Sequence, residues 1–117
     1  MVDVSFKIDK EFRTIEMHAV GHANFNKSAE GYDPVCAGIS TLAFTLGQCL
    51  DFLGEEGGLK IQPQLELERG EVHIIATPTD EFYAQCLHSF FVIQVGCHVL
   101  AANFPENVSL SPFDTLD

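Results

Sequence analysis

A histidine and a cysteine flank a glycine-bounded segment in the first third of the chain. The sequence reads Gly21-His22-Ala23 and then, a short loop later, Gly31-Tyr32-Asp33-Pro34-Val35-Cys36-Ala37-Gly38. The thiolate is the nucleophilic form of cysteine, and nearby positive charge or the N–H groups at a helix N-terminus stabilise it. A neighbouring histidine can take the thiol proton and later return it to a leaving group. These residue types and this spacing therefore favour a cysteine nucleophile, Cys36. His22 is either its general base or an ordinary loop histidine.

Local rules predict that Cys36 lies in the first turn of a helix. Asp33 is a favoured N-cap residue and Pro34 a favoured first helical residue, so Cys36 is expected at the third helical position. The unpaired N–H groups and the positive end of the helix dipole favour a thiolate there. The N–H groups at the helix start, including that of Cys36, are also candidate oxyanion donors. The alternative is a buried Cys36 that packs as a small hydrophobic residue.

Asp33 and Ser40 are candidate supporting residues. A carboxylate beside Cys36 disfavours the thiolate unless its charge is engaged, and capping the helix or orienting His22 would engage it. Ser40 follows Cys36 by one helical turn on the same face. Its hydroxyl would contact substrate or the imidazole, or it would bond back to the Cys36 carbonyl and take no part in the chemistry.

Three glycines are predicted to give the backbone around this segment conformational freedom or room for close contacts. Gly21 and Gly31 would let the loop hinge and approach substrate closely. Gly38 inside the helix costs about 1 kcal/mol relative to alanine. We therefore expect Gly38 to permit close packing or close approach of substrate.

Composition limits the class of protein. A chain of 117 residues with 46% hydrophobic residues predicts one domain with its own core, and ten Phe without Trp predict that this core is rich in Phe. The formal charge of −11 argues against a nucleic-acid surface and favours basic or neutral partners. Four widely spaced cysteines without a CxxC pair are typical of reduced thiols.

The location is expected to be cytoplasmic. The first seven residues alternate apolar and polar side chains and lack the basic start and apolar run of a signal peptide. No stretch approaches about 18 uninterrupted apolar residues, so we expect no membrane span.

The N-terminal half predicts two strands and a helix. Alternating apolar residues predict strands over 2–8 and 15–19, joined as a hairpin by a turn at 9–11. Polar residues and glycines over 20–33 predict an exposed loop. Apolar residues at helical spacing then predict a helix that Asp33 caps and Gly54 ends.

The C-terminal half predicts the same order of elements. Strands are expected over 61–68 and 72–76, and Pro63 indicates an edge strand or a bulge. A second helix is expected from about Thr79, capped by Thr79 or Asp80 and ended by Pro105, followed by a short strand at 107–110. The fold class is therefore α+β: a two-layer sandwich of two ββα units, with a mixed or antiparallel sheet and both helices on one face. Residues 1–110 form the single domain, and 111–117 an acidic, loosely ordered tail.

The strings G-H-A and G-x-D-x-V-C-A-G-x-S resemble the signature of the bacterial ribosomal-processing cysteine proteases, the Prp family. The order of strands and helices follows that family through nearly the whole chain. Pro34 replaces an aliphatic residue of the family pattern, and the loop before Cys36 is slightly longer. The resemblance implies Cys36 and His22 as catalytic residues and matches Asp33 and Ser40 to positions of the family string.

The resemblance also implies a substrate and an assembly. It implies a cysteine endopeptidase that trims the N-terminal extension of large-subunit ribosomal protein twenty-seven during ribosome assembly, without cofactor or metal. Such enzymes resemble homodimers with a mobile loop over the site, here roughly residues 23–32. The leading alternative is a noncatalytic ribosome-associated binding module. A third hypothesis is a metal site of His22 and Cys36 with His18 or Asp33, although the close Cys/His pairs of structural zinc are missing.

Overall fold

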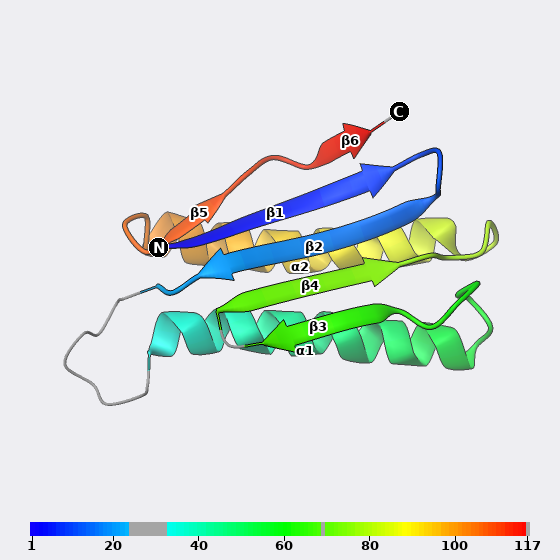
Figure 1. Cartoon of the computed structure of the whole chain (residues 1–117), viewed down its shortest axis with the longest axis horizontal. Coiled ribbons are helices and arrows are strands. Elements are labelled where there is room, and N and C mark those ends of the chain that lie inside the picture. Colours follow the sequence, from blue (N-terminus) through cyan, green and yellow to red (C-terminus); the bar gives the residue numbers. More distant parts are fainter. Residues whose placement is uncertain (24–32, 69, 117) are drawn as a thin grey trace.

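Two successive ββα units and a C-terminal pair of short strands make up the fold (Figure 1). The structure is a computed structural model, and it describes residues 1–23, 33–68 and 70–116. The elements in chain order are β1 (Val2–Asp9), β2 (Thr14–Gly21), α1 (Pro34–Glu55), β3 (Gln64–Glu68), β4 (Glu71–Ala76), α2 (Tyr83–Asn103), β5 (Val108–Leu110) and β6 (Asp114–Leu116).

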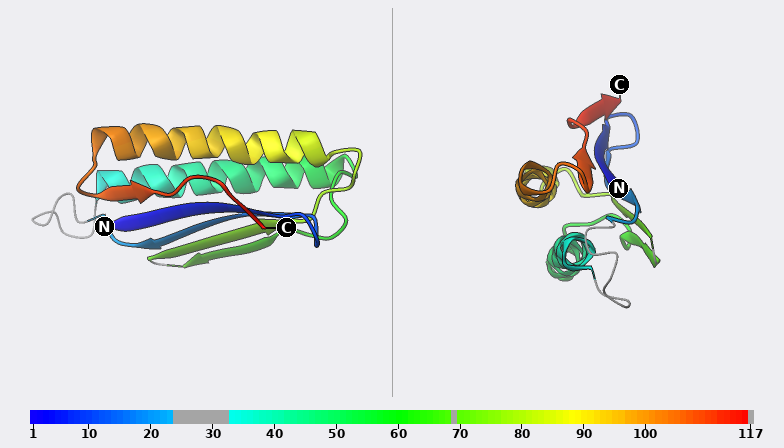
Figure 2. Two further views of the ribbon diagram at one scale, coloured as in Figure 1. Left: turned by 90° about the horizontal axis from the view of Figure 1, so that it is seen from above. Right: turned by 90° about the vertical axis from the view of Figure 1, so that its left-hand side faces the viewer.

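The strands form one mixed sheet, and both helices cover the same face of it (Figure 2). The strand order is β3-β4-β2-β1-β5, and β6 also pairs with β1. Neighbours among β1 to β4 are antiparallel, whereas β5 and β6 run parallel to β1. The predicted α+β sandwich of two ββα units is therefore confirmed, with the mixed form of the sheet.

The predicted hairpin of β1 and β2 supplies the centre of the core. Phe6 pairs with Met17 and Val4 with Ala19 in the antiparallel register. All four side chains are buried, whereas the residues between them are partly or fully exposed. Alternation of this kind turns one face of the sheet toward the helices and the other toward solvent.

Helix α1 begins where local rules predict and ends slightly later. Asp33 is the N-cap and Pro34 the first helical residue. The predicted end at Gly54 is wrong by one residue, because the helix continues to Glu55 and Gly57, at φ +78°, adopts the left-handed conformation that closes it. The Gly57 N–H donates to the Gly54 carbonyl and the Gly58 N–H to the Leu53 carbonyl, over 3.0 and 2.9 Å.

The predicted start of the second helix is wrong by four residues, because α2 begins at Tyr83 and not at Thr79. The segment before it is held to the end of α1, since the Thr79 N–H donates to the Gly58 carbonyl over 2.9 Å. Thr79 accepts the Phe82 N–H on its backbone and side-chain oxygens, which closes a separate turn. The N-cap of α2 is Phe82, which makes no side-chain capping bond.

The remaining strands combine confirmed predictions with one correction. β3 starts directly after Pro63 and lies at the edge of the sheet, and β5 occupies the predicted short strand. The expected loose tail is wrong in part, because Asp114–Leu116 pairs with the end of β1 as β6. Phe113, just before β6, packs its ring 5.4 Å from that of Phe6. Burial of this ring helps to order the C-terminal segment.

The expectation of a Phe-rich core is also wrong in part. Phe6 and Phe90 are fully buried. Four others are exposed: Phe12, Phe44, Phe52 and Phe91. Phe12 lies in the turn between β1 and β2, and the other three lie on the helices, which form a single layer on the sheet (Figure 2).

Both helices are long and apolar enough to cross a membrane, judged by length and composition alone. The core helices of globular proteins also meet this criterion, so it is weak support for a span. Each helix contains an 18-residue stretch that is its most apolar part. In α1 33% of this stretch is buried, and in α2 22% is buried. Both helices pack on one face of the sheet (Figure 2), and the absence of a membrane span stays a prediction.

Candidate active site

The N-terminus of α1 has the predicted geometry. The Asp33 side chain accepts the N–H groups of Val35 and Cys36, at 2.9 and 3.2 Å, and its backbone is extended, with φ −130° and ψ 113°. Cys36 occupies the third helical position and is half-buried. The two N–H groups of the cap partly neutralise the negative charge of the Asp33 carboxylate. This reduces the electrostatic repulsion between the carboxylate and a thiolate at Cys36.

The same cap corrects the prediction about oxyanion donors. The Cys36 N–H already bonds to the Asp33 carboxylate, and the Ala37 N–H donates to the Asp33 carbonyl at 2.9 Å. Pro34 has no N–H to offer. The backbone donors of the first turn are thus occupied in this structure.

A different backbone donor meets the thiol. The N–H of Ala23 points at Cys36 Sγ over 3.2 Å. Ala23 is the last residue of the Gly21-His22-Ala23 segment, and its side chain is only 1% exposed. The segment that carries His22 therefore contacts the nucleophile candidate directly, although thirteen positions separate Ala23 from Cys36.

The His22 imidazole is placed beside β4 and not on the thiol. His22 follows β2 directly and is exposed. A Cβ at Gly70 would lie 2.9 Å from His22 Nε2, so the ring rests against the bare backbone of that glycine. Among the described residues no hydrogen bond joins His22 to Cys36. Residues 24–32, which include most of the predicted mobile loop, lie outside the described residues.

Two of the three predicted glycines can be assessed. Gly21 has φ +112°, and a Cβ there would collide with the Met1 carbonyl oxygen. Gly38 faces Leu100 of α2, whose two methyl carbons would lie 3.3 Å from an added Cβ. Close helix packing, one of the two predicted reasons for Gly38, is therefore what the structure shows. Gly31 lies outside the described residues.

Ser40 is exposed on α1, one turn after Cys36. No hydrogen bond of Ser40 occurs within the described part of the chain, so the back-bond to the Cys36 carbonyl is not formed. Thr41 and Thr45 on the same helix do bond back, to the carbonyls of Ala37 and Thr41, at 2.8 and 2.7 Å. A contact of the Ser40 hydroxyl with substrate stays a prediction.

The other three cysteines differ from Cys36 in their surroundings. Cys49 is exposed in the second half of α1. Cys86 and Cys97 are fully buried in α2, and burial raises the pKa of each to about 12. Thiols with such pKa values stay protonated near neutral pH and are poor nucleophiles. Cys36 is thus the half-buried cysteine at a helix start.

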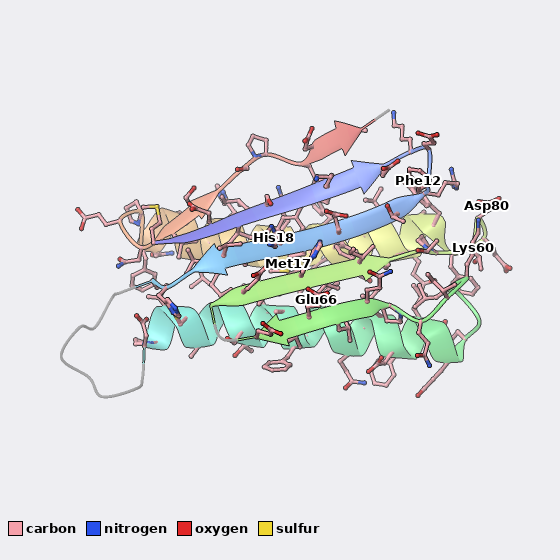
Figure 3. The ribbon with its side chains drawn as sticks, in the orientation of Figure 1. Phe12, Met17, His18, Lys60, Glu66 and Asp80 are labelled. Atoms are coloured by element: carbon pink, nitrogen blue, oxygen red, sulfur yellow. The ribbon has the colours of Figure 1, made fainter. Side chains whose placement is uncertain are left out.

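The remaining histidines lie on other elements: His18 and His73 on the sheet, and His88 and His98 on α2. His18 lies on the sheet face opposite the helices (Figure 3). His73 is its partner in the register of β2 and β4, and the two ring centroids are 4.9 Å apart. His18 Nε2 lies 3.2 Å from a Glu71 oxygen, and His73 Nε2 lies 3.6 Å from a Glu16 oxygen. Within residues 1–23, 33–68 and 70–116 no three His, Cys, Asp or Glu side chains are arranged to hold a metal ion.

Two residues at the site were missed by the sequence analysis. Gly70 lies between the two strands predicted over 61–68 and 72–76, yet it adjoins the His22 ring, and its carbonyl accepts the Gly21 N–H at 2.9 Å. Asn107 was read only as the start of a short strand, yet its Nδ2 donates to the Ala23 carbonyl at 2.8 Å. No local pattern marks either contact, because each joins segments far apart in the sequence.

Comparison with solved structures gives close matches over nearly the whole chain. The Streptococcus mutans protein SMU.848 is 25% identical, with 98% of this chain and 95% of that chain covered and a TM-score of 0.68. The ribosomal processing protease Prp of Staphylococcus aureus matches in two structures. The complex with a substrate peptide is 20% identical with a TM-score of 0.68, and that with a covalently linked product peptide is 19% identical with a TM-score of 0.65. Each covers 97% of this chain and 99% of that chain.

Comparison with curated proteins gave no match. The family model described as cysteine protease Prp matches residues 1–109, which run from the start of β1 into β5. This span contains both candidate catalytic residues and both ββα units. A match over so much of the chain shows that this protein belongs to the cysteine protease Prp family.

Proposed function

We propose that the protein is an endopeptidase that uses Cys36 as its nucleophile and His22 as its general base. The substrate would be the N-terminal extension of large-subunit ribosomal protein twenty-seven, removed during ribosome assembly. Support for the substrate comes from the family and from the Staphylococcus aureus relative, which is a ribosomal processing protease solved with a substrate peptide. The acidic chain, at a formal charge of −11, also suits a basic ribosomal substrate.

The contact between Ala23 and Cys36 is the observation that carries the proposal. It brings the segment bearing His22 against the first turn of α1, where the helix dipole favours a negative charge. A hydrogen bond from a backbone N–H to sulfur also favours the thiolate. The proposed reaction requires the His22 imidazole to turn from Gly70 toward the thiol, which the N–H of the next residue, Ala23, already contacts.

The proposed reaction has two steps. Cys36 Sγ attacks the carbonyl carbon of the scissile peptide while His22 holds the thiol proton, and a carbon–sulfur bond forms. The carbon–nitrogen bond then breaks, and His22 gives the proton to the leaving amine. In the second step His22 takes a proton from water, whose oxygen attacks the thioester. The carboxylic acid leaves and the proton returns to the thiol, so the net change is the addition of one water.

The test is cleavage of a peptide that covers the N-terminal extension of that ribosomal protein. Wild-type protein should cleave it, and Cys36→Ala should not. Cys49→Ala is the matched control, because Cys49 is an exposed thiol on the same helix and should be dispensable. Equal cleavage by Cys36→Ala and wild type would overturn the assignment of the nucleophile. Absence of cleavage with all three proteins would overturn the proposed substrate and leave the family membership unchanged.

We also propose that the protein acts in the cytoplasm, where ribosomes assemble, and as a homodimer, as the family resemblance implies. Four apolar side chains on α2 are 43 to 52% exposed: Phe91, Val92, Val95 and Val99. They recur at helical spacing and form an apolar strip, which a second copy of the chain would cover. Light scattering should give the mass of two chains for wild type and of one chain for Val95→Glu. A wild-type monomer would overturn the dimer.

A further inference from the structure

The N–H, the side chain and the carbonyl of Ala23 are each held by a contact with another part of the chain. Its N–H donates to Cys36 Sγ at 3.2 Å, its side chain is buried, and its carbonyl accepts Asn107 Nδ2 at 2.8 Å. The bond from Asn107 spans 84 positions of the sequence. It is therefore a tertiary contact that holds the residue following His22 in place.

Asn107 is itself held firmly enough to act as an anchor. It lies half-buried in the turn between α2 and β5. Its N–H donates to the Phe104 carbonyl and its carbonyl accepts the Val2 N–H, each at 2.9 Å. The end of α2, the start of β1 and the Ala23 carbonyl thus meet at this one residue. Because both backbone groups of Asn107 are hydrogen-bonded, its side chain can hold the Ala23 carbonyl in a defined place.

The His22 segment is attached at both ends. On the strand side the Gly21 N–H donates to the Gly70 carbonyl at 2.9 Å. On the other side the attachment to the end of α2 is the bond from Asn107 to Ala23. His22 lies between these two attachments. Loss of the second one would free Ala23 to turn its N–H away from the sulfur.

We propose that Asn107 is a positioning residue of the active site, a role that rests on the proposed function. By holding the Ala23 carbonyl, its side chain keeps the Ala23 N–H on Cys36 Sγ and the His22 backbone beside it. A hydrogen bond to a charged acceptor is stronger than one to a neutral acceptor, so this N–H favours the thiolate over the thiol. Asn107 acts through Ala23 and does not touch the reacting atoms.

The test measures alkylation of each cysteine by iodoacetamide across pH 5 to 10, resolved by peptide mass spectrometry on the full chain. Asn107→Asp keeps the shape and removes the donor, and Asn107→Ala removes the donor without adding charge. Asn103→Asp is the matched control, because Asn103 Nδ2 donates to the Val99 carbonyl at 2.8 Å on the exposed end of α2. Cys49 is an internal exposed standard, and the buried Cys86 and Cys97 report unfolding.

Both Asn107 variants should lower the Cys36 alkylation rate at pH 6 by about tenfold, as expected when a hydrogen bond to a charged group is lost. At pH 10, where ordinary thiols are ionised, the rate should match that of wild type. Cys49 should be unaffected, Cys86 and Cys97 should stay protected, and Asn103→Asp should behave as wild type. A shift confined to one thiol and to low pH is not produced by a general loss of stability.

An unchanged Cys36 profile in a folded Asn107→Ala protein would overturn the proposal. Exposure of Cys86 and Cys97 in both Asn107 variants would overturn it too, because Asn107 would then support the whole fold and not the site. Failure of the proposed function has a different signature. In that case wild-type Cys36 would react at pH 6 no faster than Cys49, before any variant is compared.

Discussion

The backbone N–H of Ala23 lies 3.2 Å from the sulfur of Cys36, thirteen positions later in the chain. This contact joins the end of the first hairpin to the start of the first long helix. The sulfur therefore meets both a helix N-terminus and a backbone donor from a second segment. The positive end of a helix and a backbone N–H are both surroundings that favour a negative charge on sulfur.

Gly70→Ala should impair catalysis, because an added side chain crowds the His22 ring and displaces the backbone segment that carries it, which is bonded to Gly70. An added Cβ would lie 2.9 Å from His22 Nε2 and 3.0 Å from Cε1. Displacement of a catalytic group by about 1 Å can cost roughly a hundredfold in rate, so we expect at least a tenfold loss of kcat/KM for peptide cleavage, about 1.4 kcal/mol. Steady-state cleavage kinetics on the folded variant would measure it.

Gly57→Ala provides the matched control for that variant. Gly57 has φ +78°, close to the +81° of Gly70, but no atom lies within 4 Å of its added Cβ. Both substitutions should cost about 1 kcal/mol of stability through left-handed backbone strain. Only Gly70→Ala should lose activity. Equal losses in the two variants would mean that strain, and not the His22 contact, is responsible.

Asp33 should act mainly as the helix cap. Asp33→Ala removes the acceptor for the Val35 and Cys36 N–H groups and should lower the free energy of unfolding by about 1 kcal/mol. Asp33→Asn keeps a good capping side chain and removes the charge. It should retain wild-type stability in urea unfolding and most of the cleavage activity. Loss of activity in Asp33→Asn as large as in Asp33→Ala would show that the charge itself is needed, for example to orient His22.

The folded state should lose stability in alkali because of two buried thiols. Burial raises the pKa of Cys86 and Cys97 from 9.0 to about 12, so each thiol gives up its proton more readily in the unfolded chain. Their contribution is complete below pH 9 and is lost as the pH rises toward 12. The slope should be about 1.4 kcal/mol per pH unit for each thiol. Urea unfolding at pH 8 to 11 would measure it.

Cysteine variants separate this effect from other alkaline titrations. Cys86→Ala and Cys97→Ala should each be less stable at pH 7, because they leave a cavity, but should lose stability less steeply above pH 9. Cys49→Ala, which removes an exposed thiol, should keep the full slope. An unchanged slope in both buried-cysteine variants would contradict the prediction.

Local chemistry explains why the helix start could be predicted from sequence. An N-cap, a proline after it and an apolar stripe act over a few residues, so Asp33, Pro34 and Cys36 occupy their predicted positions. The alternating residues of β1 and β2 predict their hairpin for the same reason. The start of α2 was misjudged because Thr79 has a capping side chain but closes a separate turn that is tied to Gly58.

Long-range contacts account for what the sequence could not predict. Neither the bond from Asn107 to Ala23 nor the contact of Gly70 with His22 leaves a pattern in neighbouring residues. β6 pairs with β1, which lies at the opposite end of the chain, so the residues of β6 alone do not reveal its partner. The position of the His22 ring relative to Cys36 depends on such contacts, so spacing alone predicts the pair but not its geometry.

The reactivity of Cys36 beside Cys49 in the same wild-type chain tests, without any assumption about substrate, whether Cys36 is an activated nucleophile. Both thiols would be alkylated by iodoacetamide at pH 6, and each rate would be followed by peptide mass spectrometry. We expect Cys36 to react about tenfold faster than the exposed Cys49 or more, because the helix N-terminus and the Ala23 N–H favour its thiolate. A Cys36 rate equal to or below that of Cys49 would contradict it.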